Sequence, residues 1–226
     1  MKTALIAGAS GLTGKQCLFK CLESEAYSKV IALVRSKLHL KHPKLEQVVV
    51  DYDKPETLAI AADDVYCCLG TTIKKAGSKE AFRRVDYAYP LELAKQTLTK
   101  GATGFFLVSA IGADKHSAIF YSRVKGELEE NLSALPFKTI GVVRPSLLMG
   151  TRTEFRLGER IAQVLFKPLS ILFVGPLINY KPVKDTEVAQ SLLQLAINNL
   201  TGNITIENRM IIQIAAAGLP DHLIKK

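Results

Sequence analysis

The sequence lacks features that membrane-spanning helices and nucleic-acid stacking surfaces require. The longest apolar segment, residues 161–177, is interrupted by Lys167, Pro168, Gly175 and Pro176, whereas a bilayer-spanning helix needs about 20 consecutive apolar residues. Aromatic residues make up 7% of the chain and do not interleave with basic ones, which disfavours base stacking. We therefore expect no integral membrane protein, no peripheral membrane contact and no nucleic-acid partner.

Cysteine is also scarce, and its spacing does not fit a metal site. Cys17 and Cys21 lie one helical turn apart, and Cys67 and Cys68 are neighbours in an apolar segment. Neither pair has the spacing of a zinc site, and adjacent residues of a strand point to opposite faces. We expect four reduced, mostly buried thiols and no metal.

A signal peptide is not expected either, because the first expected strand begins at the start of the sequence. The prediction is therefore a cytoplasmic protein.

Short apolar segments alternate with helical ones along the first two thirds of the chain. Residues 30–34 and 47–50 are examples of the apolar runs, and the alternation is typical of a parallel sheet covered on both faces. With 226 residues, 48% of them hydrophobic, the chain fits one domain. We predict a doubly wound α/β fold of the Rossmann type over residues 1–226, in which residues 151–226 contribute a small substrate or lid region.

The apolar pattern also gives the approximate element positions. The expected strands span residues 2–7, 29–35, 46–51, 64–69, 104–109, 138–144 and 203–207. The expected helices span residues 12–25, 55–62, 78–100, 117–134, 153–166 and 185–199, the last with Asp185 or Thr186 as N-cap, before a short apolar tail. Residues 161–177 are expected to pack in the core or lid, with a dimer surface as the first alternative and membrane contact as the weakest.

A glycine-rich turn directly after the first expected strand is the most informative segment. In residues 8–14, Gly8 permits the turn, Gly11 lets phosphates approach the backbone, and Gly14 lets the helix pack closely. The following helix N-terminus attracts a pyrophosphate through its N–H groups and dipole. The alternative is a glycine-rich turn without a ligand. The predicted phosphate-binding residues are Gly8, Ser10, Gly11, Leu12, Thr13 and Gly14.

The residue after the second expected strand bears on which dinucleotide binds. Many dinucleotide sites carry an acidic residue there, which holds the ribose hydroxyls of NAD. Here the position holds Arg35, with Lys37 and Lys41 nearby. An arginine pairs with the 2′-phosphate of NADP, which an acid would repel. The sequence therefore favours NADP over NAD, although a solvated basic loop is the simpler interpretation of most of these charges.

The ends of the third and fourth expected strands supply further candidates. Asp51 ends the third strand and is predicted either to accept a hydrogen bond from the adenine amino group or to cap a turn. Leu69, Gly70 and Thr71 end the fourth strand. A glycine there lets the backbone approach the ribose and phosphates, so we expect these three residues to contact the cofactor.

A tyrosine and a lysine on one expected helix are the candidates for acid–base chemistry. Tyr121 and Lys125 are four residues apart and share a helix face. A nearby ammonium favours the phenolate of a tyrosine and eases proton transfer. Ser109 ends the fifth expected strand and can hold a substrate oxygen at the same sheet edge. A tyrosine–lysine pair alone is common on surfaces, but its order after the glycine turn and Ser109 is far more specific.

In this combination the chain resembles the short-chain dehydrogenase/reductase superfamily, in its atypical or extended branch. The matching residues are Gly8, Gly11, Gly14, Ser109, Tyr121, Lys125, Arg144, Pro145 and Gly150. A narrower set of segments is similar to the Tat-interacting-protein oxidoreductase family, an NADP-binding atypical group. Those segments are residues 67–72, 75–77, 84–86, 112–115 and 125–127.

The resemblance implies an NADP-dependent oxidoreductase that transfers hydride to a small carbonyl substrate. It implies that Ser109 and Tyr121 bind the substrate oxygen, that Lys125 also holds the nicotinamide ribose, and that Pro145 lies beside the nicotinamide. Asp86 lies where extended members carry an asparagine, and its role stays open. The alternatives are an NADP(H)-responsive regulatory protein with a protein partner, or an epimerase or dehydratase on the same scaffold. A monomer or homodimer is expected.

Overall fold

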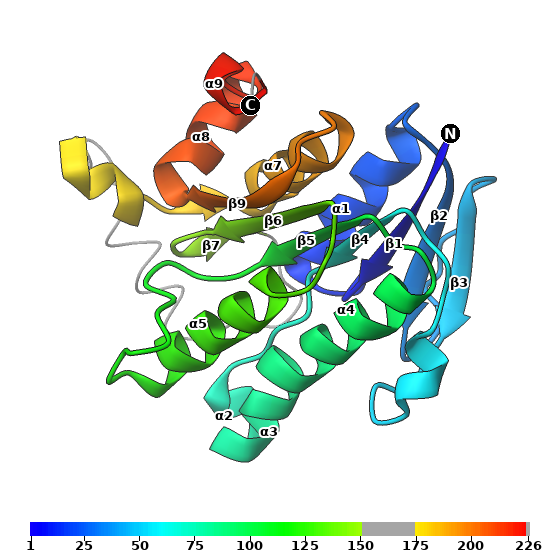
Figure 1. The fold of residues 1–226 in the computed structure, drawn as a ribbon, viewed down its shortest axis with the longest axis horizontal. Coiled ribbons are helices and arrows are strands. Elements are labelled where there is room, and N and C mark those ends of the chain that lie inside the picture. The colour runs from blue at the N-terminus through cyan, green and yellow to red at the C-terminus, as the bar shows by residue number, and fades with distance from the viewer. Residues whose placement is uncertain (151–174, 225–226) are drawn as a thin grey trace.

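The computed structural model describes residues 1–150 and 175–224 and is built around a seven-stranded parallel sheet. The strand order is β3-β2-β1-β4-β5-β6-β9 (Figure 1). The strands are β1 (Lys2–Ala7), β2 (Tyr27–Val34), β3 (Leu45–Val49), β4 (Asp64–Cys67), β5 (Gly104–Val108), β6 (Thr139–Arg144) and β9 (Gly202–Glu207). The order reverses direction between β1 and β4, which is the switch point of a doubly wound sheet. The predicted Rossmann-type fold is confirmed.

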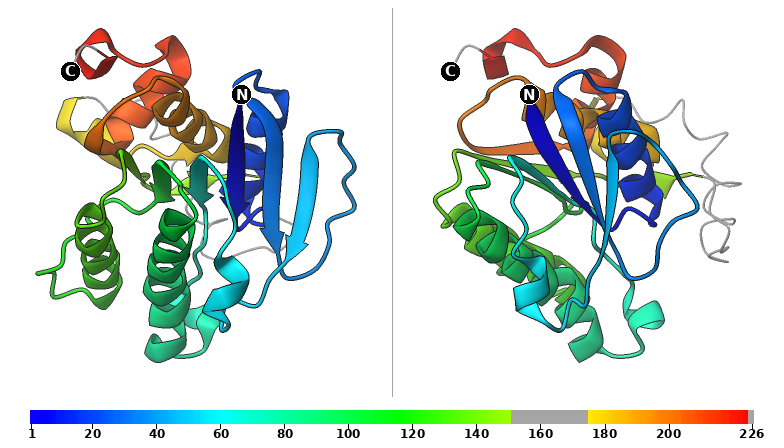
Figure 2. Two further views of the ribbon diagram at one scale, coloured as in Figure 1. Left: turned by 45° about the vertical axis from the view of Figure 1, so that its right-hand side comes forward. Right: turned by 90° about the vertical axis from the view of Figure 1, so that its right-hand side faces the viewer.

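Helices cover both faces of the sheet. On one face lie α1 (Leu12–Glu23), α7 (Asp185–Ile197) and α8 (Asn208–Ala217), and on the other lie α4 (Tyr89–Thr99) and α5 (Phe120–Ser133) (Figures 1 and 2). The alternation of strand residues creates two apolar layers: Ala4 and Ile6 of β1 pack with the first group, and Leu5 and Ala7 with the second. The inner part of β1 is therefore apolar at every position rather than alternating.

The predicted helix over residues 78–100 is divided. The structure has α3 (Lys79–Arg83), a π-helical turn η2 (Arg84–Ala88) and then α4. Pro90 cannot donate a hydrogen bond to the carbonyl of Asp86, four residues earlier, and its ring crowds that carbonyl. The wider turn accommodates the proline. It also leaves Asp86 buried, at 1% exposure.

Other differences from the predicted elements are local. Residues 55–62 form only a 3₁₀ turn, η1 (Pro55–Leu58), whose Thr57 hydroxyl donates to the backbone carbonyls of Asp51 and Lys54. Helix α7 has Lys184 as its N-cap residue, so the prediction of Asp185 or Thr186 was displaced by one or two residues. The short helices α2 (Ile73–Ala76) and α9 (Asp221–Ile224) were not predicted.

The C-terminal third is only partly within the described residues. Its predicted strand is confirmed as β9, which pairs with β6, and the predicted apolar tail is the amphipathic helix α8. A small second sheet pairs β7 (Leu148–Met149) with β8 (Val183–Lys184), and η4 (Gly175–Tyr180) precedes β8 in the chain. The predicted helix 153–166 and most of the apolar segment 161–177 lie outside the described residues. In the part described, no helix has the length and apolar character needed to cross a bilayer.

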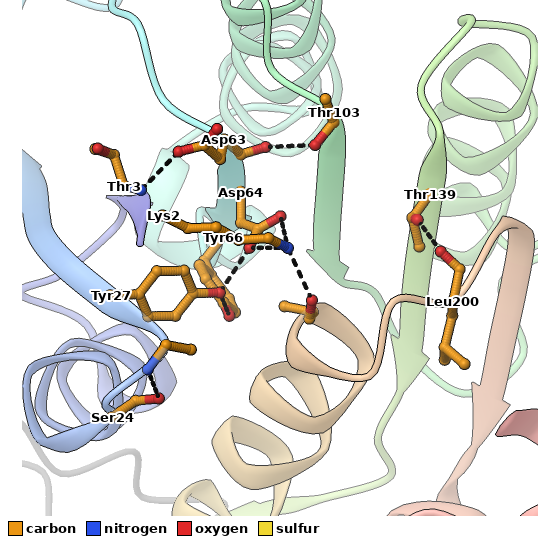
Figure 3. A network of polar contacts seen from close by, with 12 residues as sticks. Lys2, Thr3, Ser24, Tyr27, Asp63, Asp64, Tyr66, Thr103, Thr139 and Leu200 are labelled. Carbon is orange, nitrogen blue, oxygen red and sulfur yellow. Dashed lines mark hydrogen bonds and ion pairs between the residues drawn. The ribbon is translucent and has the colours of Figure 1, made fainter.

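A buried polar network ties the amino ends of the strands together (Figure 3). The Tyr27 hydroxyl donates to Asp64 at 2.8 Å and accepts from the Tyr66 hydroxyl at 2.7 Å. The Lys2 ammonium lies 3.1 Å from Asp64 and also donates to the carbonyl oxygen of Ala196 in α7. The network therefore links β1, β2, β4 and α7 at the edge opposite the glycine-rich turn.

Candidate dinucleotide and catalytic site

The glycine-rich turn connects β1 to α1 in a backbone arrangement that two of its glycines make possible. Gly8 has φ +84°, and a Cβ there would lie 2.6 Å from the carbonyl oxygen of Cys68. A Cβ on Gly14 would lie 2.1 Å from the carbonyl oxygen of Gly8. No side chain fits at either distance, so α1 packs against the end of β1 and next to the end of β4 only with glycine at both positions.

Gly11 differs from these two glycines because any residue can adopt its backbone conformation, and the contact that a side chain would make there is less severe. Its φ is −79°, and a Cβ there would approach only the carbonyl oxygen of Gly8, at 3.2 Å. Ser10 and Gly11 are exposed, whereas Thr13 and Gly14, in the first turn of α1, are buried. Helix α1 starts at Leu12 with no side-chain cap and no acidic residue in its first turn. Its first N–H groups and positive dipole end are therefore suited to attract an anionic group.

A buried hydroxyl near this turn also lacks a partner. Among the described residues, the Tyr52 hydroxyl oxygen is the one buried side-chain oxygen or nitrogen without a hydrogen bond. Burial raises the pKa of Tyr52, and the positive charge of Arg35 acts on it in the opposite direction. A buried polar group without a partner is costly, and a polar ligand atom would satisfy it. Together with exposed Arg35, directly after β2, these residues fit a nicotinamide dinucleotide.

Sequence reasoning missed Tyr52, although the signal was its position directly after Asp51. The carboxylate of Asp51 accepts the backbone N–H of Asp53 at 3.0 Å and lies 4.0 Å from the Lys54 ammonium. This is the turn-capping role that was one of the two interpretations of Asp51. Its predicted contact with adenine stays a prediction.

The loop after β4 lies between the glycine-rich turn and the candidate catalytic helix. The N–H of Cys68 donates to the carbonyl of Ala7 at 2.9 Å, which holds the start of the loop beside β1. The N–H of Thr71 donates to Asp86 Oδ2 at 2.8 Å. Gly70 is exposed, and Leu69 is half-buried. The structure thus places the predicted loop residues beside the turn.

Lys125 and Asp86 form an ion pair that is almost completely removed from water. The Lys125 Nζ lies 2.8 Å from Asp86 Oδ1, and their side chains are 4% and 1% exposed. Burial opposes the charge of Lys125, but the attraction of Asp86 and then of Tyr121 outweighs it, so the pKa of Lys125 is raised. Tyr121 lies one turn earlier on α5, half-buried, with its ring 5.5 Å from that of Phe82. The structure therefore brings Tyr121, Lys125 and Asp86 together.

Ser109 makes a different contact from the one predicted for it. Its hydroxyl donates to Glu129, a buried carboxylate on α5 that also pairs with Arg144 at 2.5 Å. Arg144 in turn lies 2.9 Å from Glu207 of β9. In this structure the hydroxyl proton of Ser109 is therefore directed to Glu129. Its predicted contact with a substrate oxygen stays a prediction.

Glu129 was also missed from the sequence, although it lies four residues after Lys125. Tyr121, Lys125 and Glu129 follow one another at helical spacing on α5.

Pro145, predicted to lie beside the nicotinamide, is buried at the end of β6, and its carbonyl accepts the N–H of Ile111 at 2.9 Å. Three of the four free cysteines are buried, and Cys17 and Cys68 lie with their sulfurs 3.6 Å apart.

Known proteins share both the sequence and the fold of this chain. The chain is 41% identical over 174 residues to Protein HTATIP2 of Rattus norvegicus, an alignment that covers 74% of this chain and 72% of that protein. The chain belongs to the HTATIP2 family. It is also 31% identical to the mitochondrial Protein FMP52 of Eremothecium gossypii, over 90% of this chain and 92% of that protein. No family model matches the sequence.

Solved structures agree on the fold. An oxidoreductase of the short-chain dehydrogenase/reductase family from Burkholderia thailandensis superposes with a TM-score of 0.68 at 18% identity, covering 95% of each chain. MoeE5, solved with UDP-glucose and NAD, superposes with a TM-score of 0.66 at 14% identity, covering 95% of this chain and 81% of that one. Such low identities establish the Rossmann-type fold and no more.

The comparison corrects the predicted location. Several relatives bear the name Protein FMP52, mitochondrial, including one from Debaryomyces hansenii that is 30% identical over 99% of this chain. The prediction of a cytoplasmic protein, which rested on reduced cysteines and the absence of a signal peptide, is therefore wrong. Reduced thiols indicate a reducing environment and do not distinguish among compartments that provide one.

Proposed function

We propose that this protein is an NADP(H)-dependent reductase of a small carbonyl compound. The observation that carries the proposal is the continuous series of contacts from the glycine-rich turn to the α5 helix. Gly8 lies against Cys68, the same loop continues to Thr71, and Thr71 shares Asp86 with Lys125. A dinucleotide with its pyrophosphate at the turn would lie over this loop with its other end at Tyr121.

The residues of α5 have complementary roles in the proposed reaction. NADPH, when bound, supplies the hydride. The Tyr121 hydroxyl gives its proton to the substrate oxygen as that oxygen gains negative charge, and the Lys125 ammonium stabilises the phenolate that remains. Ser109 holds the substrate oxygen, which requires its hydroxyl to turn away from Glu129.

The preference for NADP over NAD is part of the proposal and rests on Arg35. Its guanidinium is exposed directly after β2, where the adenosine ribose of a dinucleotide lies in folds of this type. A guanidinium makes paired, charge-assisted contacts with a phosphate. The formal net charge of +9 adds to the attraction of an anionic cofactor.

The proposal is tested by binding and turnover with the purified protein. NADPH binding is measured by calorimetry, and a library of carbonyl compounds is screened by the loss of NADPH absorbance. The Gly11→Val variant is the test of the phosphate position, because its Cβ meets one backbone atom, the carbonyl oxygen of Gly8 at 3.2 Å, which has to shift by a few tenths of an ångström, and the side chain lies where the phosphates would lie. We expect a folded variant that no longer binds NADPH. NADPH binding by folded Gly11→Val, or none by the original protein, would overturn the proposal.

A further inference from the structure

We infer that Asp86 is a positioning residue, which keeps Lys125 charged and ties it to the loop after β4. In the proposed reductase this residue would fix the position of the bound cofactor relative to the proton donor Tyr121. That consequence rests on the proposed function. The ion pair and the charge of Lys125 can be tested without any substrate.

The two carboxylate oxygens of Asp86 have different partners. Oδ1 lies 2.8 Å from the Lys125 ammonium, and Oδ2 accepts the N–H of Thr71 at 2.8 Å. A Cβ on Gly70 would be 3.4 Å from Oδ1, so the loop backbone packs directly against the carboxylate. The single side chain of Asp86 therefore connects the loop after β4 to the α5 helix.

The position of Asp86 follows from the local backbone. It lies in the π-helical turn η2, which precedes α4, and Pro90 lies four residues later. A regular helix through this segment would direct its carbonyl at the proline ring. The π-helical turn relieves that contact. Insertions of this kind are frequent at functional sites.

The other groups that face Lys125 do not replace the charge of Asp86. Tyr121 lies one turn earlier on α5, and Cys67 lies at the end of β4. Burial raises the pKa of the Cys67 thiol to about 12, so the thiol carries no charge in the neutral range. Asp86 is therefore the acidic partner that compensates for the burial of the Lys125 ammonium.

Removal of this charge has a specific consequence. Without Asp86, burial lowers the pKa of Lys125 and is opposed only by the weaker effects of Tyr121 and Cys67, because a buried ammonium is less stable than a neutral amine. Lys125 would then lose its proton as the pH rises through the neutral to alkaline range. A neutral Lys125 stabilises neither a phenolate nor a negatively polarised ligand.

The test is an Asp86→Asn variant, which keeps an acceptor for the Thr71 N–H, removes the negative charge and turns the amide NH2 group toward Lys125. The ¹³Cε signal of Lys125, assigned by its absence in Lys125→Met, is followed by NMR between pH 6 and 10. We expect Lys125 to stay charged throughout in the original protein and to titrate within this range in Asp86→Asn. Asp64→Asn, which alters the lysine–aspartate pair at the amino ends of the strands, is the matched control and should leave the Lys125 signal unchanged.

The same variants are then compared in NADPH binding above about pH 7, where the 2′-phosphate is fully ionised. Affinity should fall roughly tenfold per pH unit above the Lys125 pKa in Asp86→Asn and stay level in the original protein and in Asp64→Asn. A merely structural role would lower affinity equally at every pH. If Asp86→Asn does not fold, the titration of the original protein decides: deprotonation of Lys125 below pH 10 overturns the inference. Failure of the original protein to bind NADPH contradicts the proposed function alone, since the NMR titration does not depend on it.

Discussion

Two buried aspartates, each paired with a lysine, lie at opposite edges of the same sheet. At the amino edge Asp64 is 2% exposed and its partner Lys2 is 36% exposed. At the carboxyl edge Asp86 is 1% exposed and its partner Lys125 is 4% exposed. The amino-edge pair thus keeps one charge in water, whereas the carboxyl-edge pair withdraws both.

The difference shows what each pair does. Lys2 attracts Asp64, but burial outweighs that attraction and the hydrogen bond from Tyr27, so the pKa of Asp64 is raised. This pair belongs to a network that fastens four elements together (Figure 3). Asp86 lies beside the loop that adjoins the glycine-rich turn, at the edge where open α/β sheets bind ligands. The amino edge thus supports stability, and the carboxyl edge supports the proposed chemistry.

The largest expected effect is a difference in catalytic activity between two variants, one at a tyrosine of the carboxyl edge and one at a tyrosine of the amino edge. Tyr121→Phe should reduce kcat about 100- to 10,000-fold with an unchanged NADPH affinity, because it removes only the proton donor. Tyr27→Phe removes a hydroxyl of the amino-edge network and should leave kcat unchanged while it lowers stability. Both are measured with the carbonyl substrate found by screening and by urea unfolding. Full activity in Tyr121→Phe would show that the proton comes from another group.

The next comparison is between the two lysines. Lys125→Met leaves Asp86 buried and unpaired and should cost about 3–5 kcal/mol of unfolding free energy. Lys2→Met should cost less, because the half-exposed Lys2 loses less on removal and Tyr27 still donates to Asp64. The Lys125→Met/Asp86→Asn double variant should recover part of the loss. The free energy of unfolding of each variant is measured in urea. An equal loss in Lys125→Met and Lys2→Met would show that the two ion pairs do not differ in their contribution to stability.

A third comparison uses two basic residues at opposite ends of β2. Arg35→Ala should weaken NADPH binding by about 1.5–3 kcal/mol, or roughly 10- to 150-fold, and should leave NADH binding nearly unchanged. Lys29→Ala, at the start of the same strand, removes only a surface pair with Glu46 and should change neither. Calorimetric titration of both dinucleotides provides the measurement. Equal affinity of the original protein for NADPH and NADH would show that Arg35 does not bind the 2′-phosphate.

The smallest expected effect concerns pH and the amino-edge pair. Because the pKa of Asp64 is raised on folding, the folded protein takes up this proton at a higher pH than the unfolded chain. As the pH falls from 7 to about 4, the unfolding free energy of the original protein should therefore rise relative to that of Asp64→Asn, by at most about 1.4 kcal/mol per pH unit. A relative stability that is constant over this range, or that falls, would contradict the assignment.

Local patterns in the sequence were sufficient for much of the fold. The sequence pattern placed all seven strands of the main sheet. The inner strands stood out as apolar runs because they are buried on both faces, whereas the edge strands β3 and β9 carry polar residues between apolar ones. The glycine-rich turn was recognisable because Gly8 and Gly14 stand where no side chain fits. The face shared by Tyr121 and Lys125 follows from helical spacing alone. All of these features depend on residues close together in the chain.

The tertiary structure decided which groups meet. Lys125 joins Asp86 across two helices, Ser109 turns to Glu129, and Lys2 meets Asp64 from another strand. The periodicity of a segment specifies which face of a helix or strand is buried, but not which distant side chain packs there. Burial then determines the energetics, because the same lysine–aspartate pair behaves differently with one charge in water than with both withdrawn from it.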